Sequence, residues 1–183
     1  MSALDEIKII AVVGAGTMGQ GIAQVSAMNG YEVKLFDVNE DQLTKALQKI
    51  EANLNKGIEK GKVNPEIKDK ALANIELITD DQQLTADLII EAIVENLEIK
   101  QKLFLHLEEI NKENTILASN TSSIPITRIA AALKRPQNFV GMHFFNPAHI
   151  MKLVEVISGA ATSKEVAQTV YELAAKLGKA PVH

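Results

Sequence analysis

Three glycines and one acidic residue near the start of the chain have the types and spacing that bind a dinucleotide. Gly14, Gly16 and Gly19 form a G-x-G-x-x-G motif, and Asp37 follows 18 residues after the last of them. Glycines at these positions allow a sharp turn, a close approach of the backbone to a pyrophosphate, and tight packing of a helix on a strand. A carboxylate at this spacing accepts hydrogen bonds from a ribose hydroxyl. The residues expected to contact the cofactor here are Gly14, Ala15, Gly16, Thr17, Met18, Gly19 and Asp37.

Asp37 also predicts which dinucleotide binds. Its negative charge would repel the 2′-phosphate of NADP, and the residues that follow it, Val38, Asn39 and Glu40, include no arginine. We therefore expect NAD(H) as the cofactor. The alternative is an ordinary strand–helix turn followed by an exposed acid. The apolar run at 7–13 before the glycines, and the apolar-rich segment after them, favour the nucleotide site.

His143 and Glu155 are the residues best suited to proton transfer. A histidine takes up a proton near neutral pH, and a carboxylate can hold its ring and stabilise the imidazolium. Twelve residues separate the two, so neighbouring strands could bring them together. Such a pair would supply the base that hydride transfer from an alcohol needs. Taken alone, His143 reads equally as a core residue beside two phenylalanines, and Glu155 as an outward-facing strand residue.

Other polar groups carry weaker signals. The run SNTSS at 119–123 is either part of a ligand site or a loop that leads into the next helix. Lys56, Lys60 and Lys62 lie at the turn between two predicted helices, where lysines suit a solvated helix end. They would alternatively bind the anionic groups of a large phosphorylated substrate. Glu95 and Lys100, near the start of a predicted helix, read by themselves as surface charges.

The elements that would position these residues alternate along the chain. Apolar runs predict strands at 7–13, 31–36, 75–78, 88–93, 115–118, 139–142 and 152–157. Helical spacing predicts helices at 40–60, 65–73, 97–110, 125–133 and 164–177.

This alternation predicts an α/β fold, a Rossmann-type doubly wound and mostly parallel sheet with a helical hairpin at 40–73 inserted after the second strand. Ligands of such sheets bind beyond the carboxyl ends of the strands. We therefore expect the segments 120–123 and 143–146 to face the glycine motif.

Composition excludes several classes of function. The 183 residues suit one core, and a net charge of −4 gives no bulk attraction to nucleic acid or to anionic membranes. With no cysteine, disulfides and thiolate chemistry are excluded, and the histidines lack metal-binding spacing, so no metal is expected. Charged residues near the start interrupt any signal peptide and no apolar stretch would span a bilayer, which predicts a cytoplasmic protein.

Four stretches of the chain together resemble a known family. GAGTMGQGIAQ, DLIIEAIVENLEIK, ILASNTSSIPIT and GMHFFNPAHIMKLVEVI occur in this order. They are similar to the NAD-binding domain of 3-hydroxyacyl-CoA dehydrogenases, most closely the short-chain 3-hydroxybutyryl-CoA branch. The resemblance covers essentially the whole chain, although His149 stands where many members have proline.

The resemblance implies NAD-dependent interconversion of a (3S)-3-hydroxyacyl-CoA and its 3-oxoacyl-CoA. His143 would be the general base and Glu155 its orienting partner, with Ser122 hydrogen-bonded to the substrate oxygen. The residues implied to line the nicotinamide half of the cofactor site are Glu95, Lys100, Asn120, Ser122 and Asn146. Lys56 and Lys60 would contact the coenzyme A part of the substrate.

Domain organisation follows from the same resemblance. Residues 1–183 are expected to form the NAD-binding domain, and the helical second domain of the family, which carries most of its homodimer contact, is expected to be absent from this chain. Two alternatives stay open. The chain would be an NAD-binding module without catalysis, or a dehydrogenase of free hydroxy acids, against which the Lys56–Lys62 cluster argues.

Overall fold

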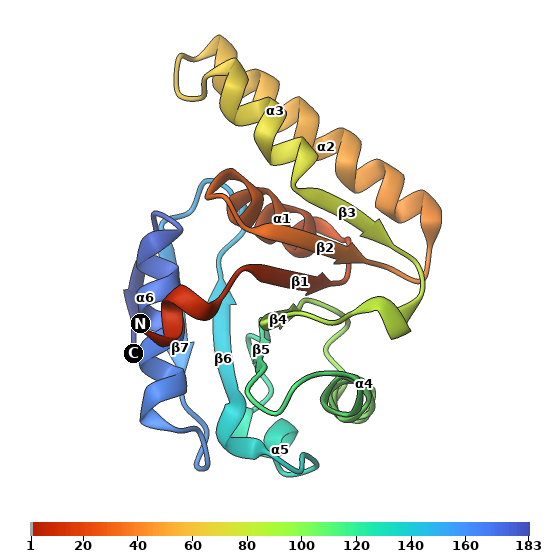
Figure 1. Ribbon diagram of the computed structural model, residues 1–183, viewed down its shortest axis with the longest axis vertical. Coiled ribbons are helices and arrows are strands. Elements are labelled where there is room, and N and C mark those ends of the chain that lie inside the picture. Colours follow the sequence, from red (N-terminus) through yellow and green to blue (C-terminus); the bar gives the residue numbers. More distant parts are fainter. Residues whose placement is uncertain (1) are drawn as a thin grey trace.

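One twisted sheet forms the centre of the molecule (Figure 1). The computed structural model describes residues 2–183. Over this range the strands follow the order β3-β2-β1-β4-β5-β6-β7-β8. Their bounds are β1 (Ile9–Val13), β2 (Glu32–Phe36), β3 (Ile75–Ile78), β4 (Leu88–Glu91), β5 (Ile116–Ser119), β6 (Phe139–Phe144), β7 (Leu153–Ile157) and β8 (Ala180–Val182). All neighbouring pairs are parallel except β6 with β7, which confirms the predicted doubly wound, mostly parallel sheet.

Helices cover both faces of this sheet. Their bounds are α1 (Thr17–Met28), α2 (Glu40–Glu59), α3 (Pro65–Ala73), α4 (Leu97–Ile110), α5 (Ile126–Ala130) and α6 (Lys164–Lys176), with short 3₁₀ turns at Ala3–Glu6, Asp81–Gln83 and Pro136–Asn138. The central strands β4 and β5 are buried at every residue, as expected for parallel strands covered on both sides. One apolar cluster lies under α1, α2 and α6 and a second under α4 and α5, where Phe104 and Phe139 meet edge to face.

The helical hairpin of α2 and α3 projects beyond the sheet (Figure 1), as the sequence predicts. Its buried side, Leu43, Ala46, Ile50 and Leu54, joins the cluster over α1. Gly57 lies in the last turn of α2, and Val63 folds back onto it: a Cβ at Gly57 would lie 2.6 Å from the Val63 side chain. The turn itself is made at Gly61, whose φ of +70° is left-handed.

Helix caps differ in a way that bears on ligand binding. An asparagine or serine side chain accepts backbone N–H groups at the start of α2, α3, α4 and α6. Helix α1 begins at Thr17 after the N-cap residue Gly16, which offers no side-chain cap, and the short helix α5 lacks one as well. The first N–H groups of α1 therefore have no side-chain acceptor from the chain's own cap position.

Several boundaries differ from the sequence prediction. Strand β6 extends to Phe144, so His143 lies within the strand and does not follow it. The cause is the antiparallel pairing with β7, which continues to Phe144 opposite Val154. Strand β4 ends at Glu91, and α5 is shorter than predicted. Among the helices of residues 2–183, none has the length and apolar character needed to cross a membrane.

Candidate functional site at the carboxyl ends of the strands

A cavity of about 300 Å³ opens beyond the carboxyl ends of β4, β5 and β6. Six of the residues singled out in the sequence line it: Met18, Glu95, Asn120, Ser122, His143 and Asn146. A larger hollow of about 660 Å³ lies at the amino ends of the strands, beside Asp87 and Ile116. None of the predicted site residues reaches this larger hollow, and ligands of open α/β sheets bind at the opposite, carboxyl edge. The smaller cavity is therefore the candidate site.

The glycine motif forms a compact turn at one side of this cavity. Gly14 has a φ of +105°, and a Cβ there would lie 2.6 Å from the Ala92 carbonyl oxygen. A Cβ at Gly19 would lie 1.6 Å from the carbonyl oxygen of Gly14, so the first turn of α1 packs directly on the loop. A Cβ at Gly16 would meet no atom within 4 Å. Only the middle glycine therefore faces open space, where a ligand's phosphates could approach the backbone.

Asp37 supports the same loop. One carboxylate oxygen accepts the N–H of Ala15 at 3.0 Å and the other accepts the N–H of Asn39 at 3.0 Å. A carboxylate has further lone pairs, so it can still accept hydrogen bonds from a ligand hydroxyl. The uncapped N-terminus of α1, the open face of Gly16 and this carboxylate together fit a dinucleotide.

His143 and Glu155 face each other across β6 and β7. They are directly opposed in the antiparallel register, and the His143 Nδ1 lies 2.8 Å from the Glu155 Oε1. Because the carboxylate accepts, Nδ1 carries the proton of the neutral ring and Nε2 is left as an acceptor. The side chain of His143 is 16% exposed and its ring packs against Phe145. The pairing of neighbouring strands expected from the sequence is thus present.

Asn120 and Ser122 come from the turn after β5. The side-chain oxygen of Asn120 accepts the N–H of Phe144 at 2.8 Å, which ties this turn to β6. Ser122 is exposed and lines the cavity. The neighbouring Thr121 is buried and accepts the N–H of Ile124, so part of the SNTSS run serves as a turn.

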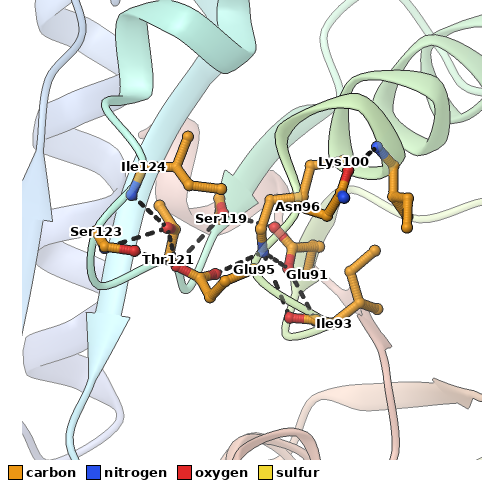
Figure 2. A network of polar contacts seen from close by, with 10 residues as sticks. Glu91, Ile93, Glu95, Asn96, Lys100, Ser119, Thr121, Ser123 and Ile124 are labelled. Carbon is orange, nitrogen blue, oxygen red and sulfur yellow. Dashed lines mark hydrogen bonds and ion pairs between the residues drawn. The ribbon is translucent and has the colours of Figure 1, made fainter.

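Lys100 is not a surface charge. It is 0% exposed, and its Nζ lies 2.5 Å from a carboxylate oxygen of Glu91 and 3.0 Å from one of Glu95 (Figure 2). It does not line the cavity, so any effect on a cofactor passes through its two partners. Glu95 also accepts the hydroxyls of Thr121 and Ser123, at 2.6 and 2.9 Å.

The pKa of Glu95 follows from these contacts. Burial alone would raise it, but hydrogen bonds from Thr121, Lys100 and Ser123 outweigh burial and lower the pKa from 4.5 to about 2. Glu95 is therefore a fixed anion at the cavity edge. Glu91 was not predicted from the sequence as a residue of the site. The one signal for it was its position, as an acidic residue directly after the apolar run LII.

Lys56 and Lys60 lie away from the cavity. Both are exposed at the far end of α2, next to Lys62. The structure therefore places them on the projecting hairpin and not with the residues that line the cavity. Within residues 2–183 no cluster of histidine and acidic side chains is arranged to hold a metal ion.

Comparison with known proteins gives consistent matches. Residues 9–183 match the family described as "3-hydroxyacyl-CoA dehydrogenase, NAD binding domain". The chain is 47% identical over 177 residues to a 3-hydroxyadipyl-CoA dehydrogenase of Escherichia coli K12, covering 96% of this chain and 37% of that protein. It is 48% identical to a probable 3-hydroxybutyryl-CoA dehydrogenase of Bacillus subtilis, over 97% of this chain and 62% of that protein.

Solved structures agree with these matches. A crystal structure of a 3-hydroxybutyryl-CoA dehydrogenase from Escherichia coli K12 superposes with a TM-score of 0.95 at 47% identity, covering 97% of this chain and 38% of that one. An (S)-3-hydroxybutyryl-CoA dehydrogenase from Ralstonia eutropha gives a TM-score of 0.94 at 42% identity, over 97% of this chain and 63% of that one. The chain thus spans between about a third and two thirds of the length of these proteins.

Proposed function

This chain belongs to the 3-hydroxyacyl-CoA dehydrogenase family through its NAD-binding domain, and we propose that it takes part in the NAD-dependent interconversion of a (3S)-3-hydroxyacyl-CoA and its 3-oxoacyl-CoA. The named relatives are dehydrogenases of 3-hydroxybutyryl-CoA and 3-hydroxyadipyl-CoA, which supports this reaction class. One continuous sheet and one family match from residue 9 to 183 support a single NAD-binding domain.

The observation that carries the proposal is the His143–Glu155 pair beside the cavity. A dehydrogenase of alcohols needs a base at the hydroxyl, and His143 is the histidine that lines this cavity in the described chain. Its Nδ1 is held by Glu155 at 2.8 Å, which leaves Nε2 for the substrate. The glycine motif, through Met18, borders the same cavity. Base and cofactor loop therefore border the same cavity, which supports their action on one substrate.

Bound NAD⁺ supplies the acceptor for the hydride that leaves C3 of the substrate. In the same direction, the C3 hydroxyl proton moves to Nε2 of His143, and the C3–O bond becomes a carbonyl. Glu155 stabilises the imidazolium that this transfer creates and keeps the ring oriented. In the reverse direction His143 returns the proton to the oxygen. Asn146 and Ser122 lie at the cavity wall, where they would orient the substrate oxygen and the cofactor.

The proposed NAD site uses the glycine loop and the first turn of α1 that follows it. Gly14 to Gly19 with Ala15, Thr17 and Met18 would hold the pyrophosphate at the helix N-terminus, and Asp37 the adenine ribose. Asn120 and Glu95 also line the cavity, where they would contact the nicotinamide half of the cofactor. Lys100 would contribute by fixing Glu95.

We propose that the projecting hairpin of α2 and α3 binds the coenzyme A part of the substrate. Lys56 and Lys60 are exposed cations at its far end, and coenzyme A carries several phosphate charges. A dehydrogenase of free hydroxy acids would have no use for them. Comparing acetoacetyl-CoA with acetoacetate as oxidants of NADH separates these two substrate classes.

The decisive experiment follows NADH absorbance in the presence of acetoacetyl-CoA, with this chain and with its His143→Ala variant. We expect the wild-type chain to oxidise NADH and the variant to lose at least about a hundredfold in rate, typical of a lost general base, with nearly unchanged NADH affinity. Equal turnover by the variant would refute the role of His143.

A second candidate is an NAD-binding module without catalysis. The family that residues 9–183 match is described as an NAD-binding domain, and the chain spans 62% or less of the length of the first two relatives. This second candidate predicts NADH binding by calorimetry and no oxidation of NADH by acetoacetyl-CoA. Turnover by the wild-type chain would exclude it.

A further inference from the structure

Three charged side chains, two of them buried, form a connected cluster at the wall of the candidate cavity. Glu91 at the end of β4 and Lys100 on α4 are both 0% exposed, and Glu95 in the loop between them has a side chain that is 40% exposed (Figure 2). The Lys100 ammonium bridges the two carboxylates, at 2.5 and 3.0 Å. With both acids ionised, this Glu91–Lys100–Glu95 triad carries a net charge of −1.

Hydrogen-bond donors surround the carboxylate of Glu91. Three donors point to its carboxylate: Lys100 Nζ at 2.5 Å, the Ser119 hydroxyl at 2.5 Å and the Ile93 N–H at 2.8 Å. Hydrogen bonds of this kind, one of them from an ammonium group, hold the carboxylate in a fixed position. Glu91 is thus a buried acidic side chain, paired with Lys100, for which the proposed proton transfer has no use.

Glu91 nevertheless belongs to the wall of the candidate cavity, together with Glu95. Its own carbonyl accepts the N–H of Asn120 at 2.9 Å, and the next residue, Ala92, touches the turn at Gly14. It therefore stands between the cofactor loop and the turn that carries Ser122. A charge held away from water acts on a neighbouring ligand with little screening by salt.

We propose that Glu91 sets the preference of this site for the oxidised over the reduced dinucleotide. The nicotinamide ring is positively charged in NAD⁺ and neutral in NADH, whereas the rest of the molecule is the same. A net negative triad at the cavity wall attracts only the oxidised ring. The inference rests on NAD binding and not on the proposed reaction, since it concerns the two dissociation constants alone.

A purely structural role makes a different prediction. If Glu91 only held the loop and β5 together, its replacement would weaken NAD⁺ and NADH binding by the same factor. An electrostatic role changes the ratio of the two dissociation constants. The ratio therefore separates the two roles, whatever happens to each affinity.

The test is calorimetric titration of NAD⁺ and of NADH into this chain and into its Glu91→Gln variant. Glutamine keeps the size of the side chain and its oxygen acceptor while removing the charge. We expect the ratio of the NAD⁺ to the NADH dissociation constant to rise about fivefold, as removal of one partly shielded charge would produce. Raising the salt concentration should leave this change nearly intact, because the charge is buried.

Glu108→Gln is the matched control. Glu108, on α4, is a buried acid like Glu91. It accepts the N–H groups of Lys134 and Arg135 and does not line the cavity. We expect it to leave the ratio unchanged. If Glu91→Gln does not fold, Glu95→Gln removes the same unit of charge from a more exposed position and should shift the ratio in the same direction.

An unchanged ratio in a folded Glu91→Gln variant that still binds both dinucleotides would overturn the inference and leave the proposed reaction standing. If the wild-type chain bound neither form, the inference and the proposed function would both fall.

Discussion

Replacement by alanine should destabilise the fold strongly at Gly19 and only slightly at Gly16, whereas dinucleotide affinity should fall at both. In Gly19→Ala the added Cβ would lie 1.6 Å from the carbonyl oxygen of Gly14, less than half of an ordinary carbon–oxygen contact. Neither the backbone of α1 nor that of the loop can rotate away, so the helix and loop must separate by more than about 1 Å. Overpacking of this kind costs about 3 kcal/mol of unfolding free energy or more, and the distorted loop would also lose dinucleotide affinity.

Gly16→Ala is the counterpart within the same loop. Its Cβ meets no atom within 4 Å, and the backbone there, at φ −73° and ψ −167°, suits alanine. We expect a loss of stability below about 1 kcal/mol, the size of a changed N-cap residue. The new methyl group would, however, occupy the space into which the pyrophosphate fits, so NADH affinity should fall by at least about tenfold.

Urea denaturation followed by circular dichroism gives the stability of both variants, and titration of NADH fluorescence gives their affinities. The expected pattern is an unstable, non-binding Gly19→Ala and a stable, non-binding Gly16→Ala. Equal stability of the two variants would refute the packing argument at Gly19. Undiminished NADH binding by Gly16→Ala would refute the placement of the pyrophosphate.

Three further outcomes are expected from charged residues. Lys100→Met should lower the free energy of unfolding by about 3–5 kcal/mol in urea denaturation, because it leaves buried carboxylate charge uncompensated; a loss below about 1 kcal/mol would contradict this. In the folded chain the pKa of Glu95 is lowered from 4.5 to about 2. Its ionised carboxylate therefore stabilises the fold at pH values above the unfolded-state pKa near 4.5, and this contribution is lost as the pH falls toward 2. The free energy of unfolding of Glu95→Gln should therefore depend less on pH between about 5 and 2 than that of the wild-type chain. Burial, and to a smaller extent Lys179, lowers the pKa of His149 in the folded chain. Protonation of His149 therefore opposes folding, and stability should fall as the pH drops through 6.5. Thermal denaturation from about pH 7.5 to 5.5 should show this fall in the wild-type chain and not in His149→Gln.

The parts of the fold that local signals control could be predicted from the sequence. Helix α3 starts at Pro65 after the capping Asn64, and these two residues alone define its beginning. The glycine turn is likewise local, since Gly14 needs its left-handed backbone whatever packs around it. The mostly parallel sheet followed from the order of apolar runs, because strand–helix–strand units wind in one direction.

Tertiary contacts decided what the sequence reasoning missed. Lys100 has the pattern of a surface residue near a helix start, and it becomes buried only because Glu91 on another element neutralises it. Glu91 is the last residue of β4, and the serine that donates a hydrogen bond to it, Ser119, lies 28 positions further along the chain. The extension of β6 past His143 depends on β7, which pairs with it in the opposite direction. No local pattern reports such long-range partners.

The register of β6 and β7 decides whether the carboxylate of Glu155 lies opposite His143 at all. In the register of β6 and β7, Glu155 stands opposite His143, with Val154 and Val156 on either side of it. Inserting or deleting one residue within β7 would put a valine opposite the histidine and turn the carboxylate to the other face of the sheet. Within the connection between the strands, the exposed residues 150–152 are free of this constraint. Over evolutionary time, changes in length should therefore accumulate in that connection and be purged from β7, so the spacing of these two residues along the chain can drift while their distance in space does not.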